Sequence, residues 1–173
     1  MFQTISPLEI TDNVFKLLDK DWMLITAGPP EAHNTMTASW GGLGVLWGRY
    51  VAWCVIRPQR YTYQFMERSD AFTLSFFETQ YRPALDLCGT KSGRDINKAE
   101  AAGLTPVPGI LPGTTHFEEA RLVLACRKIY THDIDPERFL DPSIDRNYPA
   151  KDYHRMYLGE VAEARIRRQA PIR

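Results

Sequence analysis

Short apolar runs, rich in β-branched and aromatic side chains, recur along the chain and are bounded by Gly, Pro and Asn. This pattern is typical of strands rather than of long helices. We expect strands at 22–27, 35–40, 50–56, 71–77, 121–130 and 155–166. Helical periodicity is weaker, and the connections at 60–70, 82–89 and 95–103 are the segments that carry it.

Six or more strands with short helices between them predict a mainly β protein, a closed or half-closed antiparallel barrel, because closure removes exposed strand edges. A parallel doubly wound sheet would need steady alternation with helices of about 10–15 residues, and the pattern lacks it. No repeat or linker divides the chain, so we expect residues 1–173 to form one domain. In the last helix, Gly103 falls where a left-handed cap is expected, and Asp95 stands near the start.

Composition narrows the classes of partner. The chain has 21 basic and 21 acidic side chains, and this zero net charge offers no basic face for nucleic acid. No window approaches the roughly 20 apolar residues of a membrane span, and the N-terminus lacks a secretory pattern, so we expect a cytoplasmic protein with no membrane partner. Cys54 and Cys126 lie in apolar runs and are expected to be small buried hydrophobic residues.

The stretch "NTMTASWGGLG", residues 34–44, combines a strand-like alternation with unusual polarity. In a strand, Asn34 and Trp40 would share one face, while Thr37 and Ser39 would lie on the other. The run ends at glycines, where the chain is free to bend and the backbone can approach a ligand closely. A polar strand that closes on a glycine turn, with the Trp40 ring in the core, is the simpler alternative.

Two further segments concentrate hydrogen-bond donors and positive charge. "RPQRYTYQ", from Arg57, places two arginines, Tyr61 and Thr62 at an expected helix start, where an anion is favoured. "CGTKSGRDINK", residues 88–98, is a basic loop leading into a helix, but it lacks the nucleotide-binding order GxxxxGK[ST]. The alternative for the segment from Arg57 is a solvated helix start, and the alternative for residues 88–98 is a flexible surface turn.

Histidines offer little sign of metal chemistry. The four are scattered without metal-ligand spacing, so no metal site is expected. His154, in "DYHRMYLGEV", stands just ahead of a strand, where an imidazole can reach a ligand at a barrel mouth. An ordinary, internally satisfied histidine is the alternative.

Five segments, taken in order, resemble the flavin reductase-like family of FMN-binding split barrels, which includes flavoredoxin. They are "NTMTASWGGLG", "RPQRYTYQFM" ahead of "AFTLSFF", "CGTKSGRDINKAEAAGL", "EEARLVLACRKI" and "DYHRMYLGEV". The resemblance covers most of the chain and implies an antiparallel split β-barrel of Greek-key type. It also implies that the first of these segments lies against the isoalloxazine and ribityl parts of FMN.

Carried over position by position, the resemblance implies cofactor contacts from four regions. The first strand would contribute Asn34, Thr37, Ala38, Ser39 and Trp40, and the phosphate region Arg57, Tyr61 and Thr62. The closing loop would contribute Cys88, Gly89, Ser92, Arg94 and Lys98, and the late strand His154. No side chain is assigned as catalytic, because the flavin carries the electron chemistry.

The resemblance implies an FMN-dependent oxidoreductase that passes electrons from NAD(P)H or a protein donor to a small-molecule or protein acceptor. It also implies a homodimer with FMN near the subunit interface. A pure electron carrier and a non-catalytic β-barrel that binds a small molecule or protein are alternatives that the residues leave open. The role of residues 131–153, which carry the acidic, proline-bearing run "DIDPERFLDPSIDRNYPAKD", is also open between a lid and a loop packed on a partner subunit.

Overall fold

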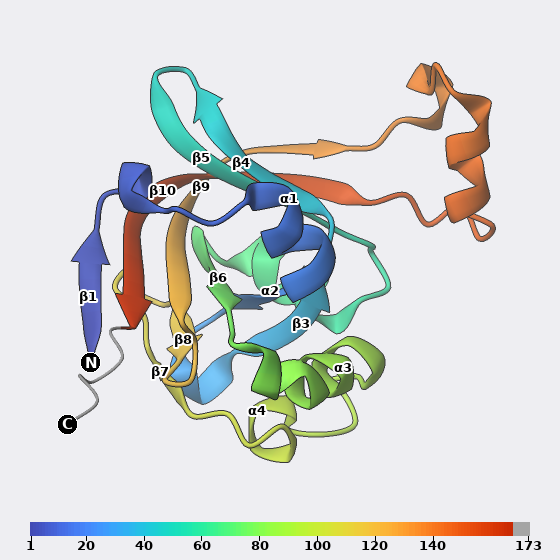
Figure 1. Ribbon diagram of the computed structural model, residues 1–173. Coiled ribbons are helices and arrows are strands. Elements are labelled where there is room, and N and C mark those ends of the chain that lie inside the picture. Colours follow the sequence, from blue (N-terminus) through green and yellow to red (C-terminus); the bar gives the residue numbers. More distant parts are fainter. Residues whose placement is uncertain (168–173) are drawn as a thin grey trace.

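The computed structural model describes residues 1–167, which form an antiparallel eight-stranded sheet with helices packed against it (Figure 1). The strand order is β3-β2-β6-β9-β10-β5-β4, and β1 also pairs with β10. The strands of this sheet are β1 (Phe2–Ile5), β2 (Met23–Ala27), β3 (Asn34–Ala38), β4 (Gly41–Leu46), β5 (Arg49–Ile56), β6 (Ala71–Phe76), β9 (Leu122–Asp133) and β10 (Arg155–Arg167). A separate two-stranded sheet joins β7 (Pro106–Pro108) to β8 (Thr115–Phe117).

The helices are short and lie in the connections. They are α1 (Val14–Lys16), α2 (Tyr61–Arg68), α3 (Arg82–Thr90) and α4 (Lys98–Ala101), with short 3₁₀- or π-helical segments η1 (Pro7–Glu9), η2 (Leu17–Asp21), η3 (Pro30–Ala32), η4 (Thr79–Tyr81), η5 (Pro136–Arg138) and η6 (Pro142–Asn147). Among the described residues no helix is long and apolar enough to cross a bilayer. The expected mainly β architecture is confirmed, although the sheet does not close within residues 1–167 and leaves β3 and β4 as edges. The last six residues of the expected single domain, 168–173, lie outside the described part.

The pattern missed four strands, β1, β4, β7 and β8. Residues 41–46, where a bend was expected, form β4 and pair with β5. Gly42 is needed there because the Trp53 indole lies against the strand: a Cβ at this position would stand 2.3 Å from the indole Nε1. Gly42 therefore permits the close approach of a tryptophan ring within the sheet.

The helix expected at 95–103 is shorter than the pattern indicates. It begins after Asn97, whose side-chain oxygen accepts the Glu100 N–H at 3.3 Å, so Asp95 is not the cap. Its end was correctly expected: Gly103 has φ +64°, a left-handed conformation that glycine adopts without steric cost. The basic loop thus enters its helix later than the sequence suggests.

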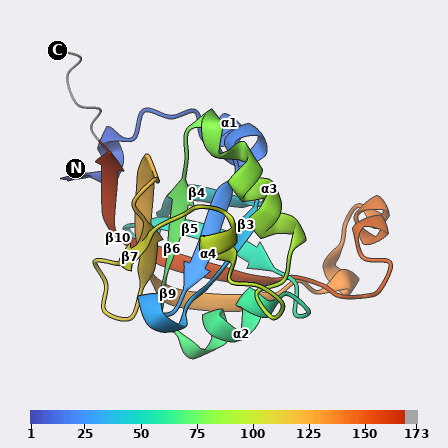
Figure 2. The same ribbon diagram turned by 90° about the horizontal axis from the view of Figure 1, so that it is seen from below.

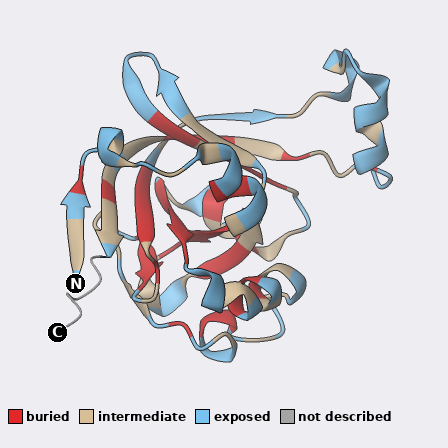
Figure 3. Cartoon of the chain, in the orientation of Figure 1, coloured by how far each residue is buried: buried red, intermediate tan, exposed pale blue. Residues whose placement is uncertain are grey.

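Two apolar clusters hold the elements together (Figure 3). The larger fills the interior of the curved sheet and includes Phe72, Leu124 and Tyr157. The second lies between the sheet and helices α3 and α4, where Leu85 and Ala99 pack with Phe117. Cys54 and Cys126 are buried and free, as expected of small apolar residues. The second cluster fixes α3 and α4, and with them the loop that joins them.

Two hairpins extend from the body of the protein. The β4–β5 hairpin forms one projection, and the ends of β9 and β10 carry another, tipped by η5 and η6; Figures 1 and 2 show this tip away from the sheet. We call residues 134–154 the excursion. Its tip is mostly exposed, as Figure 3 shows, and its last residue, His154, is buried just ahead of β10.

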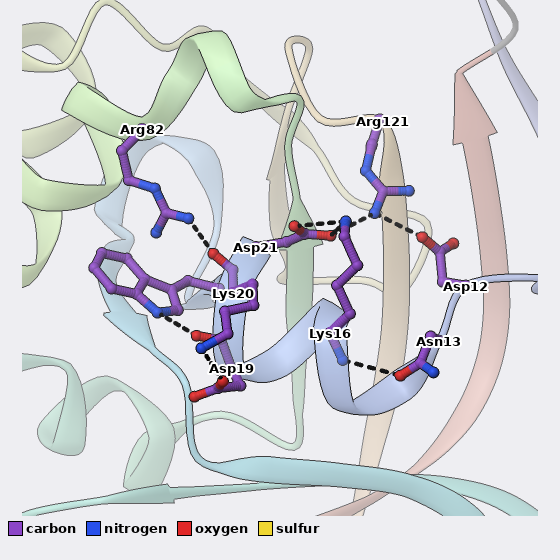
Figure 4. A network of polar contacts seen from close by, with 9 residues as sticks. Asp12, Asn13, Lys16, Asp19, Lys20, Asp21, Arg82 and Arg121 are labelled. Carbon is purple, nitrogen blue, oxygen red and sulfur yellow. Dashed lines mark hydrogen bonds and ion pairs between the residues drawn. The ribbon is translucent and has the colours of Figure 1, made fainter.

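A polar network fastens the turn before β2 (Figure 4). Arg121 donates to Asp12 at 2.7 Å and to Asp21 at 3.4 Å, and Lys16 pairs with Asp21 at 3.1 Å. Arg82 donates to the Lys20 carbonyl from α3. These contacts tie η2, α3 and the start of β9 to one another.

Candidate functional site

The end of β3 forms one wall of a cavity of about 200 Å³, which we call the strand cavity. Small residues at the wall, Ala38 and Ser39, leave room beside the half-exposed Trp40, whose ring centroid lies 5.2 Å from that of His154. Because the strand ends at Ala38, side chains of both strand faces reach the cavity. Its lining residues are Met36, Thr37, Ala38, Ser39, Trp40, Val55, Arg57 and His154.

A second cavity of about 140 Å³, the basic cavity, lies at the N-terminus of α2. Its lining residues are Gln59, Arg60, Tyr61, Thr62, Thr90, Lys91, Ser92, Arg94 and Lys98. Four cationic side chains and three hydroxyl-bearing Ser and Thr residues stand here, and this lining contains no carboxylate. The helix start adds free backbone N–H groups, since no side chain caps it. The arrangement suits a phosphate-sized anion.

Hydrogen bonds between elements set the walls of the basic cavity. Asn34 of β3 donates to the Thr62 hydroxyl at 2.8 Å, which joins the strand to the first turn of α2. Arg60 donates to the Gly89 carbonyl at 3.0 Å, and burial lowers the pKa of its guanidinium. The Arg94 guanidinium lies 4.7 Å from the centre of the Tyr61 ring. Helix α2, strand β3 and the loop after α3 therefore meet around this cavity.

Lys98 is the most buried charge at the site, with 5% of its surface exposed. Its Nζ donates to the carbonyls of Thr35 at 2.9 Å and Cys88 at 2.8 Å. Since an ammonium has three N–H donors, one remains for a ligand in the cavity that Lys98 lines. Burial lowers the pKa of Lys98 to about 8, and the nearby positive charge of Arg60 contributes. A bound anion would oppose both effects, because its negative charge favours the protonated amine and so raises the pKa of Lys98.

Arg57 and His154 define the far side of the strand cavity. Arg57 Nη1 pairs with Asp152 Oδ2 at 2.6 Å, and Nη2 donates to the Asn147 carbonyl at 2.8 Å. The His154 Nδ1 lies 2.9 Å from the Tyr148 hydroxyl. Burial lowers the pKa of His154 to about 4, with a further contribution from Arg57 and an opposing one from Asp152. His154 is therefore neutral at physiological pH.

The structure distributes the predicted residues over both cavities. Thr37, Ala38, Ser39, Trp40, Arg57 and His154 line the strand cavity, while Tyr61, Thr62, Ser92, Arg94 and Lys98 line the basic cavity. Asn34, Cys88 and Gly89 line neither. Asn34 positions Thr62, and the other two residues present backbone carbonyls to Lys98 and Arg60. The Cys88 thiol is buried, which raises its pKa to about 11.

Arg57, which the family resemblance placed near the phosphate, lines the strand cavity, whereas Arg60 lines the basic cavity. Both arginines stand in "RPQRYTYQ", three positions apart, and the turn between them sends them to different cavities. The signal that favours Arg60 is its position immediately before the first residue of α2. Met36 and Val55 supply apolar surface to the strand cavity. Nothing in the sequence distinguished them from other apolar strand residues.

A larger cavity of about 610 Å³ lies beside this site, between the β2–β3 loop, α2 and residues 93–99. It shares Asn34, Tyr61 and Lys98 with the site residues. Its lining includes the exposed Glu31 and several apolar side chains, so it does not concentrate donors as the basic cavity does. Although this third cavity is larger, we place the candidate site in the strand and basic cavities. These two share the bordering segment 57–62, and one offers small and apolar walls while the other offers positive charge.

The fold and site together define an antiparallel β protein with the strand cavity beside the basic cavity, a class suited to phosphorylated ring cofactors. The chain belongs to the flavin reductase like domain family, whose family model matches residues 17–172. The predicted family is therefore confirmed, and flavin-related redox chemistry is the general function it defines. No curated protein matches the chain.

Solved structures of similar fold agree. Flavoredoxin of Methanosarcina acetivorans has a TM-score of 0.68 at 20% identity, covering 97% of this chain and 79% of that one. A Shewanella frigidimarina protein described with a split barrel domain has a TM-score of 0.66 at 15% identity, covering 95% and 77%. The NADH:FAD oxidoreductase SgcE6 of Streptomyces globisporus, in complex with NAD and FAD fragments, has a TM-score of 0.62 at 18% identity, covering 87% and 86%. The split-barrel fold is thus confirmed.

Proposed function

We propose that this protein binds FMN, with the isoalloxazine in the strand cavity and the phosphate in the basic cavity. The observation that carries this proposal is the pairing of a cavity walled by small residues and an indole with one lined by four cations. The segment 57–62 borders both cavities, so one ligand with a flat ring and a phosphate suits the pair. Solved structures of the same fold support the choice of FMN: one is described as an FMN-binding domain of a flavin reductases-like enzyme from Shewanella baltica, and another as an FMN-binding protein from Thermus thermophilus.

The proposed activity is that of an oxidoreductase that takes electrons from NAD(P)H or a protein donor and passes them to a small-molecule or protein acceptor. FMN would supply the electron-accepting ring system. The chain's own residues bind and orient: Lys98 and Arg60 offer donors to the phosphate, and His154 borders the ring. The neighbour described as an NADH:FAD oxidoreductase supports a nicotinamide donor. Steady-state oxidation of NADH or NADPH would separate this enzyme from a pure electron carrier.

The decisive experiment is the visible absorption spectrum of the purified protein, with and without added FMN, followed through a sizing column. Flavin bands that elute with the protein are the expected result. Lys98→Met should weaken retention, whereas Lys20→Met should not, because the Lys20 side chain is exposed and, among the described residues, forms an ion pair only with its neighbour Asp19. A protein that remains colourless with added FMN would instead favour a non-catalytic binding barrel.

A homodimer with FMN near the subunit interface is part of the proposal. Large apolar side chains are exposed on the β4–β5 hairpin and the adjacent β9, and the Trp47 and Tyr130 rings lie 6.2 Å apart there. Exposed apolar groups of this kind favour burial against a second copy. They are Val45, Leu46, Trp47, Tyr50 and Tyr130. Light scattering should give a dimer mass for the wild type and a monomer mass for Trp47→Glu; a wild-type monomer would refute this part.

A further inference from the structure

The excursion is anchored to the strand cavity at its root. The Ile134 N–H donates to the His154 carbonyl at 2.9 Å and closes the base of the excursion. Arg57, a wall residue of the cavity, holds the Asp152 carboxylate and the Asn147 carbonyl. Gln59 donates to the same carboxylate. The excursion therefore begins and ends as part of the cavity wall, although its outer turns project from the body.

Tyr148 is the buried aromatic residue of the excursion, with 3% of its surface exposed, whereas Leu140 nearby is fully exposed. Its ring packs 4.8 Å from that of Tyr153, and the Arg57 guanidinium lies 5.2 Å from its centre. Its hydroxyl reaches the His154 Nδ1 at 2.9 Å. The polar end of this buried side chain thus meets His154 directly.

The hydrogen bond between these residues has a preferred direction. Within the described chain, the Tyr148 hydroxyl has no other partner. If it donates to Nδ1, both groups are satisfied and the imidazole proton stands on Nε2; the reverse direction leaves the buried phenolic proton without an acceptor. Nε2 makes no hydrogen bond to the described residues, yet it is not sealed from solvent, so it remains available in the cavity that His154 lines.

We propose that Tyr148 is a positioning residue, which fixes His154 as a neutral donor that presents its Nε2–H to a ring acceptor in the strand cavity. The excursion would then be part of the redox site rather than only a lid or a subunit contact. The identity of the occupant rests on the proposed function. The orientation of His154 rests on Tyr148, with Arg57 and Asp152 as the charged groups that face the imidazole.

The tautomer can be measured without any cofactor. In protein labelled with ¹⁵N-histidine, the His154 ring signals are assigned by their loss in His154→Gln. We expect a protonated Nε2 and an unprotonated, hydrogen-bonded Nδ1 in the wild type. Tyr148→Phe should remove the hydrogen-bond shift at Nδ1, whereas Tyr153→Phe should not, because the Tyr153 hydroxyl donates to Asp145. A wild-type His154 protonated on Nδ1 would overturn the proposal.

The midpoint potential of bound FMN tests whether this orientation matters at the site. An N–H donor beside the ring favours the reduced, anionic flavin, so Tyr148→Phe should lower the potential below that of the wild type and of Tyr153→Phe. If Tyr148 acts through His154, adding Tyr148→Phe to His154→Ala should change nothing further. Equal shifts in both backgrounds would refute the positioning role. Failure of the wild type to bind FMN would refute the proposed function, while the cofactor-free tautomer would still decide the inference.

Discussion

The Lys98 ammonium donates to the Thr35 carbonyl at 2.9 Å, so the first residue of α4 is joined to the middle of β3. The same group donates to Cys88 in α3. This one buried charge therefore connects β3, which forms a wall of the strand cavity, to helices α3 and α4, which contribute Thr90 and Lys98 to the lining of the basic cavity. Its burial lowers its pKa, so its charge depends on pH within an accessible range.

FMN binding should weaken as pH rises through the lowered pKa of Lys98, about 8. A phosphate dianion favours the protonated amine, so the free protein must gain a proton to bind above this pH. We expect the Kd to increase by about tenfold between roughly pH 7 and 9. Flavin fluorescence titrations measure it. Lys98→Met should bind more weakly with little pH dependence, and riboflavin, which lacks the phosphate, should show none; a wild-type Kd that is flat over this range would contradict the Lys98 contact.

His154 should make the folded state sensitive to acid. Its folded pKa, about 4, is below the ordinary value of 6.5, so its contribution to stability is complete above 6.5 and is lost as the pH falls toward 4. Urea unfolding at pH values near 7 and 4.5 should show a loss from this group of about 1–3 kcal/mol. The glutamine in His154→Gln does not titrate, so this variant should lose less free energy of unfolding between these two pH values. Equal losses in the two proteins would argue against a depressed pKa.

Arg121→Met should destabilise the fold by about 1–3 kcal/mol, because Asp12 and Asp21 would both lose a partly buried partner. Arg138→Met provides the control, since its ion pair with Asp135 is largely exposed and should contribute less than about 1 kcal/mol. Chemical denaturation of both variants tests the difference. Similar small effects would mean that the network in Figure 4 adds little to stability.

Gly42→Ala should destabilise the protein by about 1–3 kcal/mol, because the new methyl group would overlap the Trp53 indole. Gly44, two residues along the same strand, has open space where a methyl group would stand, with no atom within 4 Å, so Gly44→Ala should be nearly neutral. Thermal unfolding followed by tryptophan fluorescence compares the two. Equal stability of the two variants would mean that Trp53 moves aside without cost.

The sequence predicted the elements that carry a local signal. The apolar runs at 22–27 and 71–77 form strands β2 and β6, as expected, and Gly103 caps its helix. Strand β4 could not be predicted from "GGLGVL", because Gly42 makes room for the indole of Trp53, which lies across the hairpin on β5. Strand β4 is determined by tertiary packing, and the periodicity of its own residues does not indicate a strand.

The site was predictable by segment but not by side chain. The basic loop and the start of α2 do meet. The turn at residues 58–60, however, determines that Arg60 lines the basic cavity and Arg57 lines the strand cavity. Likewise, the meeting of Tyr148 with His154 depends on how the excursion returns to the sheet. Such relationships depend on backbone direction, which spacing along the chain leaves undetermined.

The pairing of β1 with β10 has a consequence for how the molecule assembles. Thr4 and Glu163, which are joined by a 2.6 Å hydrogen bond between these strands, stand 159 positions apart. During synthesis, the first strand must therefore wait for almost all of the described chain before its partner exists. Since contacts so distant along the chain slow folding, we expect this protein to complete its sheet late and to refold on the millisecond to second scale or slower.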